Sequence, residues 1–310
     1  MKIRTLGTTG RHVTELCIGT SALGSMPGTY GYSVDEAQAL DTLRRVFQGP
    51  ITFVDTANEY GADGASERLI GTVLRELGGV PEGFLIATKV DPDRYGDFSG
   101  RRVHASVAES RERLGMDRLP LVYLHDPERI PFEASMGPGG AVEALRKLQA
   151  DGVIGHLGVA GGPIGLLRGY VATGVFEAVI THNRFTLLDR SAEPLLDDCA
   201  AAGVAVVNAA PFGSGLLAKG PGATDRYYYR PAPPQILEAA KRIQAACERH
   251  GVPLAAAALQ FSMREPRIAS TIVGITRPER IDQMAELAEY PVPESLWQEI
   301  SPAPREVWLS

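Results

Sequence analysis

The 310-residue sequence predicts an α/β protein, a single (β/α)8 TIM barrel over residues 1–310 with an N-terminal β-hairpin at the barrel floor. Eight short apolar runs alternate with amphipathic segments of helical periodicity, and strands that alternate with helices pair in parallel through right-handed crossovers. No stretch of Pro, Gly and Ser is long enough to separate two domains. Eight units in a chain of this size favour a closed barrel over an open doubly wound sheet, which is the alternative.

The elements follow in chain order. Residues 3–16 form two extended pieces around Gly7-Thr8-Thr9-Gly10, which is typical of a hairpin turn. The apolar runs predict strands at Leu16–Gly19, Ile51–Val54, Phe84–Thr88, Leu121–Leu124, Ile154–Val159, Ala178–Thr181, Val204–Val207 and Ala269–Val273. Helices are expected at 35–47, 65–77, 101–114, 139–150, 164–172, 192–201, 235–249 and 278–289, with an additional Ala-rich helix between Val252 and Met263.

One loop is longer than the others. It runs from Pro211 to Pro234, is rich in Gly, Pro and Tyr, and follows the seventh strand. A loop of this length inside a compact domain is usually functional, and at this position it would overhang the active face. Within it, residues 227–230 could form a wall against the substrate or an exposed loop. In the C-terminal tail, Trp297 and Trp308 could cover the pocket or pack on the barrel exterior.

Composition excludes several classes of function. The formal net charge is -6 and no basic run is present, so we expect no nucleic-acid partner. No apolar stretch has the length of a membrane span, which predicts a soluble, cytoplasmic protein with no membrane contact. Cys17, Cys199 and Cys247 lie far apart in apolar or helical contexts, as expected for buried structural thiols in a reducing compartment.

Ionisable side chains follow three consecutive predicted strands. Asp55 ends the second strand with Tyr60 five residues later, Lys89 ends the third, and His125 ends the fourth. Each alone has a structural interpretation, such as a helix cap for Asp55 or a solvated rim cation for Lys89. Because the carboxyl ends of barrel strands meet at one face, the four together indicate a catalytic site.

Such a set suits proton transfer at a carbonyl or an alcohol. A free tyrosine has a pKa of about 10, and a neighbouring ammonium is expected to lower it. Tyr60 would be the general acid or base, Lys89 would tune it, Asp55 would hold Lys89, and His125 would donate a hydrogen bond to the substrate oxygen. No metal is required.

These four residues together resemble the catalytic tetrad of the aldo-keto reductases. Three later segments resemble landmarks of the same family: Gly152–Gly158, Asn183–Arg190 and Ile272–Arg280. The resemblance covers residues 6–287. It implies a TIM barrel, an extended nicotinamide cofactor across its mouth, and hydride transfer at a carbonyl.

Within this family, Asn183–Arg190, Asn208–Gly215 and Tyr227–Ala232 look most similar to the bacterial aldose 1-dehydrogenases, which include enzymes for L-fucose and D-threo-aldoses, with pyridoxal 4-dehydrogenase as a relative. This resemblance implies oxidation of a sugar hemiacetal to a lactone, with Tyr60 taking the proton. The cofactor would be held by residues at the strand ends and beyond them: Gly19, Thr20, Asp55, His182, Asn183, Phe212, Gly213, Ser214, Gly215, Leu216, Gly274, Thr276, Arg280 and Gln283.

The sequence departs from the family in four places that concern the cofactor. Ala160-Gly161-Gly162 replaces a Ser-Asn pair that holds the carboxamide, and Ala209 replaces an aromatic that stacks on the nicotinamide; His182 or Asn183 could take over the first role. Gly274 replaces a Lys that meets the 2′-phosphate of NADP, and Gln283-Met284 replaces Glu-Asn. We therefore expect NAD to be favoured, with or without NADP use, although Arg277 could restore the phosphate contact.

The substrate is expected to be a small sugar or carbonyl compound, and the protein a monomer or a homodimer. Three alternatives remain open at this point. The first is an NADPH-dependent aldehyde or ketone reductase of the same family. The second is a Schiff-base aldolase with Lys89 as nucleophile, which the nearby Asp55 disfavours because it stabilises the charged amine. The third is a barrel that binds nicotinamide as a regulatory module.

Overall fold

The computed structural model describes residues 1–300 and has the predicted closed barrel. Eight parallel strands pair in the order β12-β3-β4-β5-β6-β7-β8-β9. Their bounds are β3 Leu16–Gly19, β4 Phe53–Asp55, β5 Leu85–Val90, β6 Leu119–His125, β7 Ile154–Gly161, β8 Ala178–His182, β9 Ala205–Ala209 and β12 Ile268–Gly274. The eight predicted strands are confirmed, with ends that shift by a few residues.

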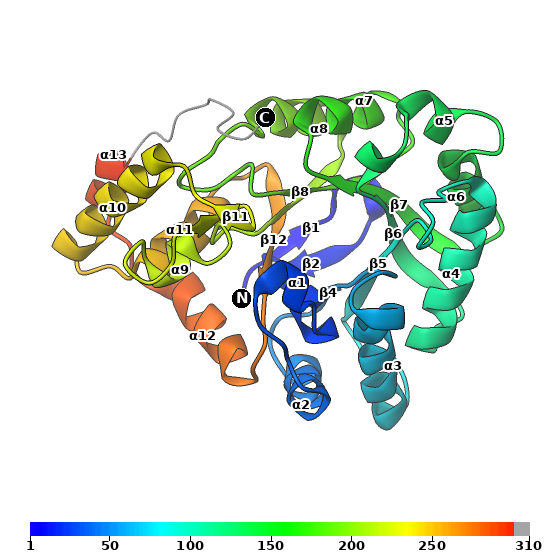
Figure 1. The fold of residues 1–310 in the computed structure, drawn as a ribbon, viewed down its shortest axis with the longest axis horizontal. Coiled ribbons are helices and arrows are strands. Elements are labelled where there is room, and N and C mark those ends of the chain that lie inside the picture. The colour runs from blue at the N-terminus through cyan, green and yellow to red at the C-terminus, as the bar shows by residue number, and fades with distance from the viewer. Residues whose placement is uncertain (301–310) are drawn as a thin grey trace.

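The helices surround the strands in a ring (Figure 1). The longer ones are α2 Glu36–Phe47, α3 Ala65–Leu77, α4 Gly100–Leu114, α6 Ala141–Ala150, α7 Ile164–Ala172, α8 Glu193–Ala202, α10 Pro234–Arg249, α11 Leu254–Met263 and α12 Glu279–Glu289. Short helices also occur in the connections: η1 Gly7–Thr9, η2 Ser21–Gly24, α1 Pro27–Tyr30, η3 Ala62–Gly64, η4 Pro127–Arg129, α5 Phe132–Met136, α9 Leu216–Lys219 and α13 Glu294–Ile300. No helix among residues 1–300 is long and apolar enough to span a bilayer.

Strand residues are apolar on both faces because each face is covered. Leu16 and Ile18 of β3 pack outward in the cluster beneath the helices, whereas Cys17 between them packs inside the barrel with Phe53 and Tyr123. This alternation explains why the strands are continuous apolar runs rather than alternating polar and apolar patterns. The three cysteines are buried and free, as expected.

The N-terminal hairpin closes the amino-terminal end of the barrel. Strands β1 Ile3–Thr5 and β2 His12–Thr14 pair antiparallel, and Leu6 after β1 and Val13 within β2 join the cluster inside the barrel. Gly7 has a φ of +54°, and a Cβ there would lie 2.6 Å from the backbone nitrogen of Ala205, at the start of β9. The hairpin therefore lies at the barrel floor, as predicted.

The helix between Val252 and Met263 is a barrel helix rather than an additional one. Ser262 on α11 accepts a hydrogen bond from Asn208 of β9 at 2.8 Å and lies 2.7 Å from the hydroxyl of Thr271 on β12. The α10 helix instead packs against α11 and α13, in a cluster outside the barrel. The prediction had assigned α10 and α11 the other way round, because periodicity does not show which helix contacts the strands.

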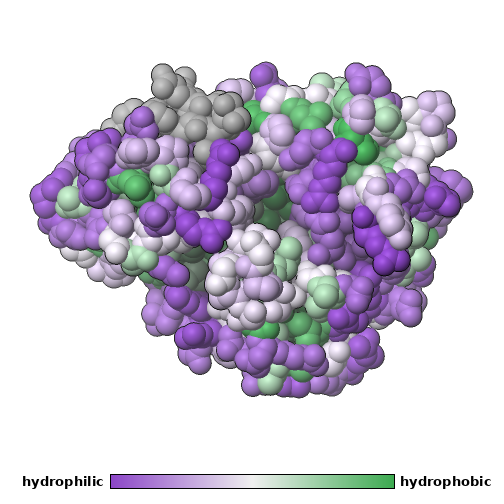
Figure 2. All heavy atoms as spheres, in the orientation of Figure 1, coloured by the Kyte–Doolittle hydropathy of each residue, from purple (hydrophilic) through white to green (hydrophobic). Residues whose placement is uncertain are grey.

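The long loop after β9 lies at the carboxyl-terminal face. It contains α9 and a small hairpin of β10 Arg226–Tyr227 and β11 Arg230–Pro231. Trp297 on α13 is buried in the outer cluster beside α10, with the guanidinium of Arg264 4.5 Å from its ring centroid, so it packs on the barrel exterior. Trp308 lies outside the described residues. Figure 2 shows this face as mostly hydrophilic, with apolar atoms deep in a central hollow.

Candidate active site

The four ionisable residues predicted at the strand ends lie together. Asp55 ends β4, Lys89 lies in β5 and His125 ends β6, while Tyr60 follows β4 in the connection to α3. Lys89 Nζ donates to Asp55 Oδ2 at 2.7 Å and to Tyr60 Oη at 3.0 Å. The rings of Tyr60 and His125 meet edge to face, with centroids 5.7 Å apart. The carboxyl ends of three adjacent strands thus place all four groups within one site.

The ammonium of Lys89 is fixed by three acceptors in a nearly water-free position. Its third partner is the carbonyl oxygen of Thr56 at 2.8 Å, and the side chain is 2% exposed. Each of the three ammonium protons is therefore donated to one of these acceptors. A neutral, nucleophilic amine would lose the charge-assisted bond to Asp55, which disfavours the aldolase alternative.

One electrostatic prediction is wrong for the phenol. We expected Lys89 to lower the pKa of Tyr60, but burial raises this pKa well above its ordinary value, and the carboxylate of Asp55 adds to the rise. The physical reason is that Lys89 and Asp55 form a pair without net charge. The phenolate would gain a hydrogen bond from Lys89 but no net positive charge, and burial then dominates. Tyr60 is a neutral phenol at pH 7.

The imidazole of His125 has a buried carboxylate partner. Its Nδ1 lies 2.5 Å from Oδ1 of Asp91, which follows β5 and is fully buried. Burial opposes protonation of the imidazole, but the charge of Asp91 and its hydrogen bond outweigh burial, so the pKa of His125 is raised. Nε2 makes no hydrogen bond within residues 1–300.

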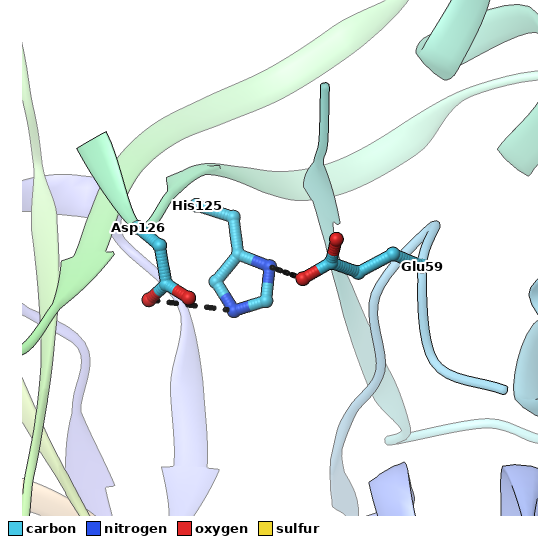
Figure 3. Close-up of side chains that lie close together, drawn as sticks. All are labelled: Glu59, His125 and Asp126. Carbon is cyan, nitrogen blue, oxygen red and sulfur yellow. Dashed lines mark ion pairs between the residues drawn. The ribbon is translucent and has the colours of Figure 1, made fainter. Parts of the chain in front are cut away.

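Two further carboxylates flank His125, as Figure 3 shows. Glu59 Oε1 lies 3.9 Å from Nδ1, and Asp126 Oδ1 lies 3.9 Å from Nε2. Within residues 1–300, Glu59, His125 and Asp126 form a group whose ligand atoms lie within 4.8 Å of one another, close enough to be considered as a metal site. Arg129 already neutralises both acids, with contacts of 2.6 Å and 2.8 Å to Glu59 and 3.1 Å to Asp126. Because the acids face opposite ring nitrogens and share a guanidinium, they form an ion-pair cluster rather than a metal site.

The residues predicted for the cofactor include several on the opposite arc of the rim. Gly19 at the end of β3 pairs with both Asp55 and Gly274, and His182 at the end of β8 pairs with Ala209. Strands β8, β9, β12 and β3 are consecutive in the barrel. The rim is therefore divided between an arc with the ionisable set and an arc whose strands end in Gly19, His182, Ala209 and Gly274.

Two of the residues predicted to hold the cofactor, His182 and Asn183, have polar side chains beside the rim. Asn183 lies in a left-handed conformation with a φ of 58°, and its Nδ2 is 3.2 Å from Nδ1 of His182. Its Oδ1 is buried without a hydrogen-bond partner in the described chain. Burial lowers the pKa of His182 to about 4, which keeps this imidazole neutral at pH 7. Thr20 is already committed, since its hydroxyl donates to the Asp55 carbonyl at 2.9 Å.

The other predicted cofactor residues lie in the segments that follow β9 and β12. Phe212, Gly213, Ser214 and Gly215 form the turns that lead into α9, and Leu216 is the first residue of that helix. Three consecutive residues of this segment, 213–215, have positive φ. The carbonyl of Thr276 accepts a hydrogen bond from Gln38, and Arg280 and Gln283 lie exposed on α12. Both side chains are therefore accessible to solvent on α12.

A hairpin of residues 226–231, here the tyrosine hairpin, crosses the barrel mouth. Tyr228 stacks on His182 with centroids 5.7 Å apart, and Tyr229 packs edge to face on Tyr30 of α1 at 5.9 Å. Arg226 also donates to the carbonyl of Thr29 at 3.4 Å. The hairpin connects the end of β8 with the connection after β3, which favours a wall of the site over a freely exposed loop.

Sequence reasoning missed Asp91, Glu59 and Arg129. Asp91 lies two residues after Lys89, just beyond the end of β5, so its position at a strand end was a usable signal. Glu59 and Arg129 lie in connections, and their 70-residue separation gives no local pattern. Only the closed barrel brings these connections together.

Comparisons with known proteins support this assignment of the fold. A family model described as the aldo/keto reductase family matches residues 15–303. The chain is 34% identical to D-threo-aldose 1-dehydrogenase from a Pseudomonas species and 31% identical to pyridoxal 4-dehydrogenase from Microbacterium luteolum, each over 95% of both chains. Its fold is similar to that of the aldo-keto reductase AKR11C1 from Bacillus halodurans in its holo form, with a TM-score of 0.80, 24% identity, and coverage of 99% of this chain and 98% of that chain.

The family match extends over most of the chain and includes every strand of the barrel and all four ionisable residues at its rim. Members of this family are oxidoreductases that use nicotinamide cofactors. The chain belongs to the aldo-keto reductase family.

Proposed function

We propose that this protein oxidises C1 of a free aldose to a lactone with a nicotinamide cofactor. The observation that carries the proposal is Lys89, which joins Asp55 and Tyr60 by hydrogen bonds of 2.7 Å and 3.0 Å at the barrel rim. The relative with 34% identity is an aldose 1-dehydrogenase, which supports an aldose as the substrate class.

The reaction requires one proton acceptor and one hydride acceptor. The C1–H bond breaks, its electron pair leaves as hydride, and the C1 hydroxyl gives up its proton as the lactone carbonyl forms. Bound nicotinamide supplies the hydride acceptor. Tyr60 first releases its own proton to solvent, and as phenolate it then takes the proton of the C1 hydroxyl; Lys89 stabilises that phenolate while Asp55 holds the ammonium in place.

The residues on the opposite arc fit a nicotinamide. The unpartnered Oδ1 of Asn183 could accept from a carboxamide, and the neutral imidazole of His182 lies beside it. A Cβ on Gly19 would lie 2.8 Å from Ile272 Cγ2, so a larger residue at this strand end would force the Ile272 side chain to shift. We further propose NAD over NADP, because Gly274 leaves the end of β12 without a cation.

One observation favours a second candidate, reduction of an aldehyde or ketone. Burial raises the pKa of Tyr60 and so favours the neutral phenol, which is the form that protonates a carbonyl oxygen. In oxidation the same burial makes deprotonation of Tyr60 costly. The two directions share the site and differ in which form of Tyr60 starts the reaction.

The test is NADH and NADPH formation on L-fucose, D-arabinose, L-galactose, pyridoxal and simple alcohols, compared with Tyr60→Phe. We expect sugar-dependent NADH formation in the wild type and a loss of about 10²–10⁴-fold in the variant. If the sugars are inert and aldehydes are reduced with NADPH, the aldose assignment is wrong and the second candidate replaces it.

A further inference from the structure

A buried carboxylate outside the predicted set connects two of its members. Oδ1 of Asp91 lies 2.5 Å from Nδ1 of His125, and Oδ2 of Asp91 accepts a hydrogen bond of 3.1 Å from the backbone N–H of Glu59. Glu59 directly precedes Tyr60. One carboxylate therefore fixes the imidazole with one oxygen and the backbone that carries the phenol with the other.

The Asp91 carboxylate determines which ring nitrogen of His125 is protonated. An ionised carboxylate only accepts, so the ring nitrogen that faces Asp91 must carry a hydrogen. In the neutral imidazole the proton is then on Nδ1, and Nε2 presents a lone pair. In the imidazolium Nε2 becomes a donor. The second form is the one that can donate to a substrate oxygen, as the sequence predicts for His125.

We propose that Asp91 is a positioning residue that holds the proton of His125 on Nδ1, turns Nε2 toward the reacting oxygen, and sets the distance between His125 and Tyr60. This inference rests on the proposed function for its kinetic part only. The tautomer of His125 is a property of the protein itself and can be measured without substrate.

The surroundings of His125 allow its charge to change with pH. Asp91 faces it from the position directly after β5, Glu59 from the connection after β4, and Asp126 and Arg129 from the connection after β6. Lys89 opposes protonation of His125 by its charge. Arg129 compensates both Glu59 and Asp126 through direct ion pairs. Within residues 1–300 the carboxylate of Asp91 makes an ion pair only with His125, and the guanidinium of Arg102 on α4 donates instead to the backbone carbonyl of Asp91 at 3.0 Å.

The first arm of the test is nitrogen-15 NMR of histidine-labelled wild-type protein. Long-range couplings report which ring nitrogen carries the proton. We expect neutral His125 as the Nδ1–H tautomer, titrating above pH 6.5. Neutral His125 with its proton on Nε2 would overturn the proposal, whatever the activity of the protein.

The second arm compares Asp91→Asn with Asp126→Asn. Both remove one carboxylate near the same imidazole, but only Asp91 is hydrogen-bonded to it. Asparagine also suits the left-handed φ of 41° at position 126. We expect Asp91→Asn to lower kcat about 10²-fold with little change in the sugar KM, to lower the pKa of His125 by NMR, and to shift the acidic limb of the kcat/KM profile by the same amount. Asp126→Asn is expected to give much smaller changes.

The outcomes separate positioning from electrostatics and from folding. Equal effects of the two variants would show that only negative charge matters, and would overturn the proposal. If Asp91→Asn lowers the thermal midpoint while the NMR titration of His125 stays as in the wild type, Asp91 acts only as a structural tie to Glu59, which also overturns it. Failure of the sugar assay alone would refute the proposed function and leave the NMR result standing.

Discussion

Replacement of Lys89 by methionine tests the pair at the centre of the site. In the wild type the ammonium donates to Asp55 Oδ2, to the Thr56 carbonyl and to Tyr60 Oη, and both members of the ion pair are nearly inaccessible to water. Lys89→Met keeps an unbranched side chain in the same space but removes the charge. The carboxylate of Asp55 is then buried without a counter-ion, which costs about 3–5 kcal/mol of folding free energy.

Asp55→Asn is expected to change the folding stability in opposite directions in the wild type and in Lys89→Met. Asp55→Asn alone should destabilise the protein, because Lys89 then loses its counter-ion. Added to Lys89→Met, the same change removes an unpaired buried charge and should restore about 2 kcal/mol. The assay is urea unfolding of the wild type, both single variants and the double variant at pH 7. If Asp55→Asn destabilises the methionine variant as much as it destabilises the wild type, the two groups are not coupled and the reasoning fails.

Lowering the pH checks the same account independently. Burial already raises the pKa of Asp55 in the wild type, and loss of Lys89 should raise it further. A carboxyl group whose pKa is higher in the folded state than in the unfolded state contributes its full stabilisation below the unfolded pKa of about 3.9. That contribution to the free energy of unfolding is lost as the pH rises through the folded-state pKa. The deficit of Lys89→Met should therefore shrink from pH 7 to pH 5. Lys147→Met, which breaks an exposed pair with Asp151, is the control and should change stability by less than about 1 kcal/mol.

Three further predictions concern the cofactor side. Gly274→Lys should raise the NADP to NAD ratio of kcat/KM by about 10- to 100-fold, since an added Cβ meets no atom within 4 Å and one charge-assisted phosphate bond is gained; an unchanged ratio would contradict the proposed phosphate position. By NMR, His182 should stay neutral until about pH 4. Its contribution to the free energy of unfolding should fall as the pH drops from about 6.5 to about 4. Titration near pH 6.5 would contradict the conclusion that burial lowers the pKa of this imidazole. Gly213→Ala should cost about 2–4 kcal/mol in urea unfolding, because its φ is positive and its Cβ would lie 2.4 Å from the Tyr227 ring, whereas Gly222→Ala in the same loop meets no atom and should be near neutral.

The positions of the strands were predictable because each strand is a run of consecutive apolar residues. Buried parallel strands need apolar side chains on both faces, so each appears as a short run, and Ile51–Val54 or Leu121–Leu124 is recognisable without knowledge of its neighbours. Once eight such runs alternate with helices, barrel closure brings their carboxyl ends together. The ionisable set at Asp55, Lys89 and His125 follows from that rule.

The sequence by itself therefore determined the barrel, its hairpin floor and the four ionisable groups at the rim. The tertiary structure alone decided that α11 lies against the strands, that Asp91 joins His125 to the backbone before Tyr60, and that the pKa of Tyr60 is raised by burial rather than lowered by Lys89. The physical reason is that periodicity records whether a side chain is buried, but not its partner. Desolvation and pairing depend on which connections meet, and residues 34 positions apart, such as Asp91 and His125, meet only after the barrel closes.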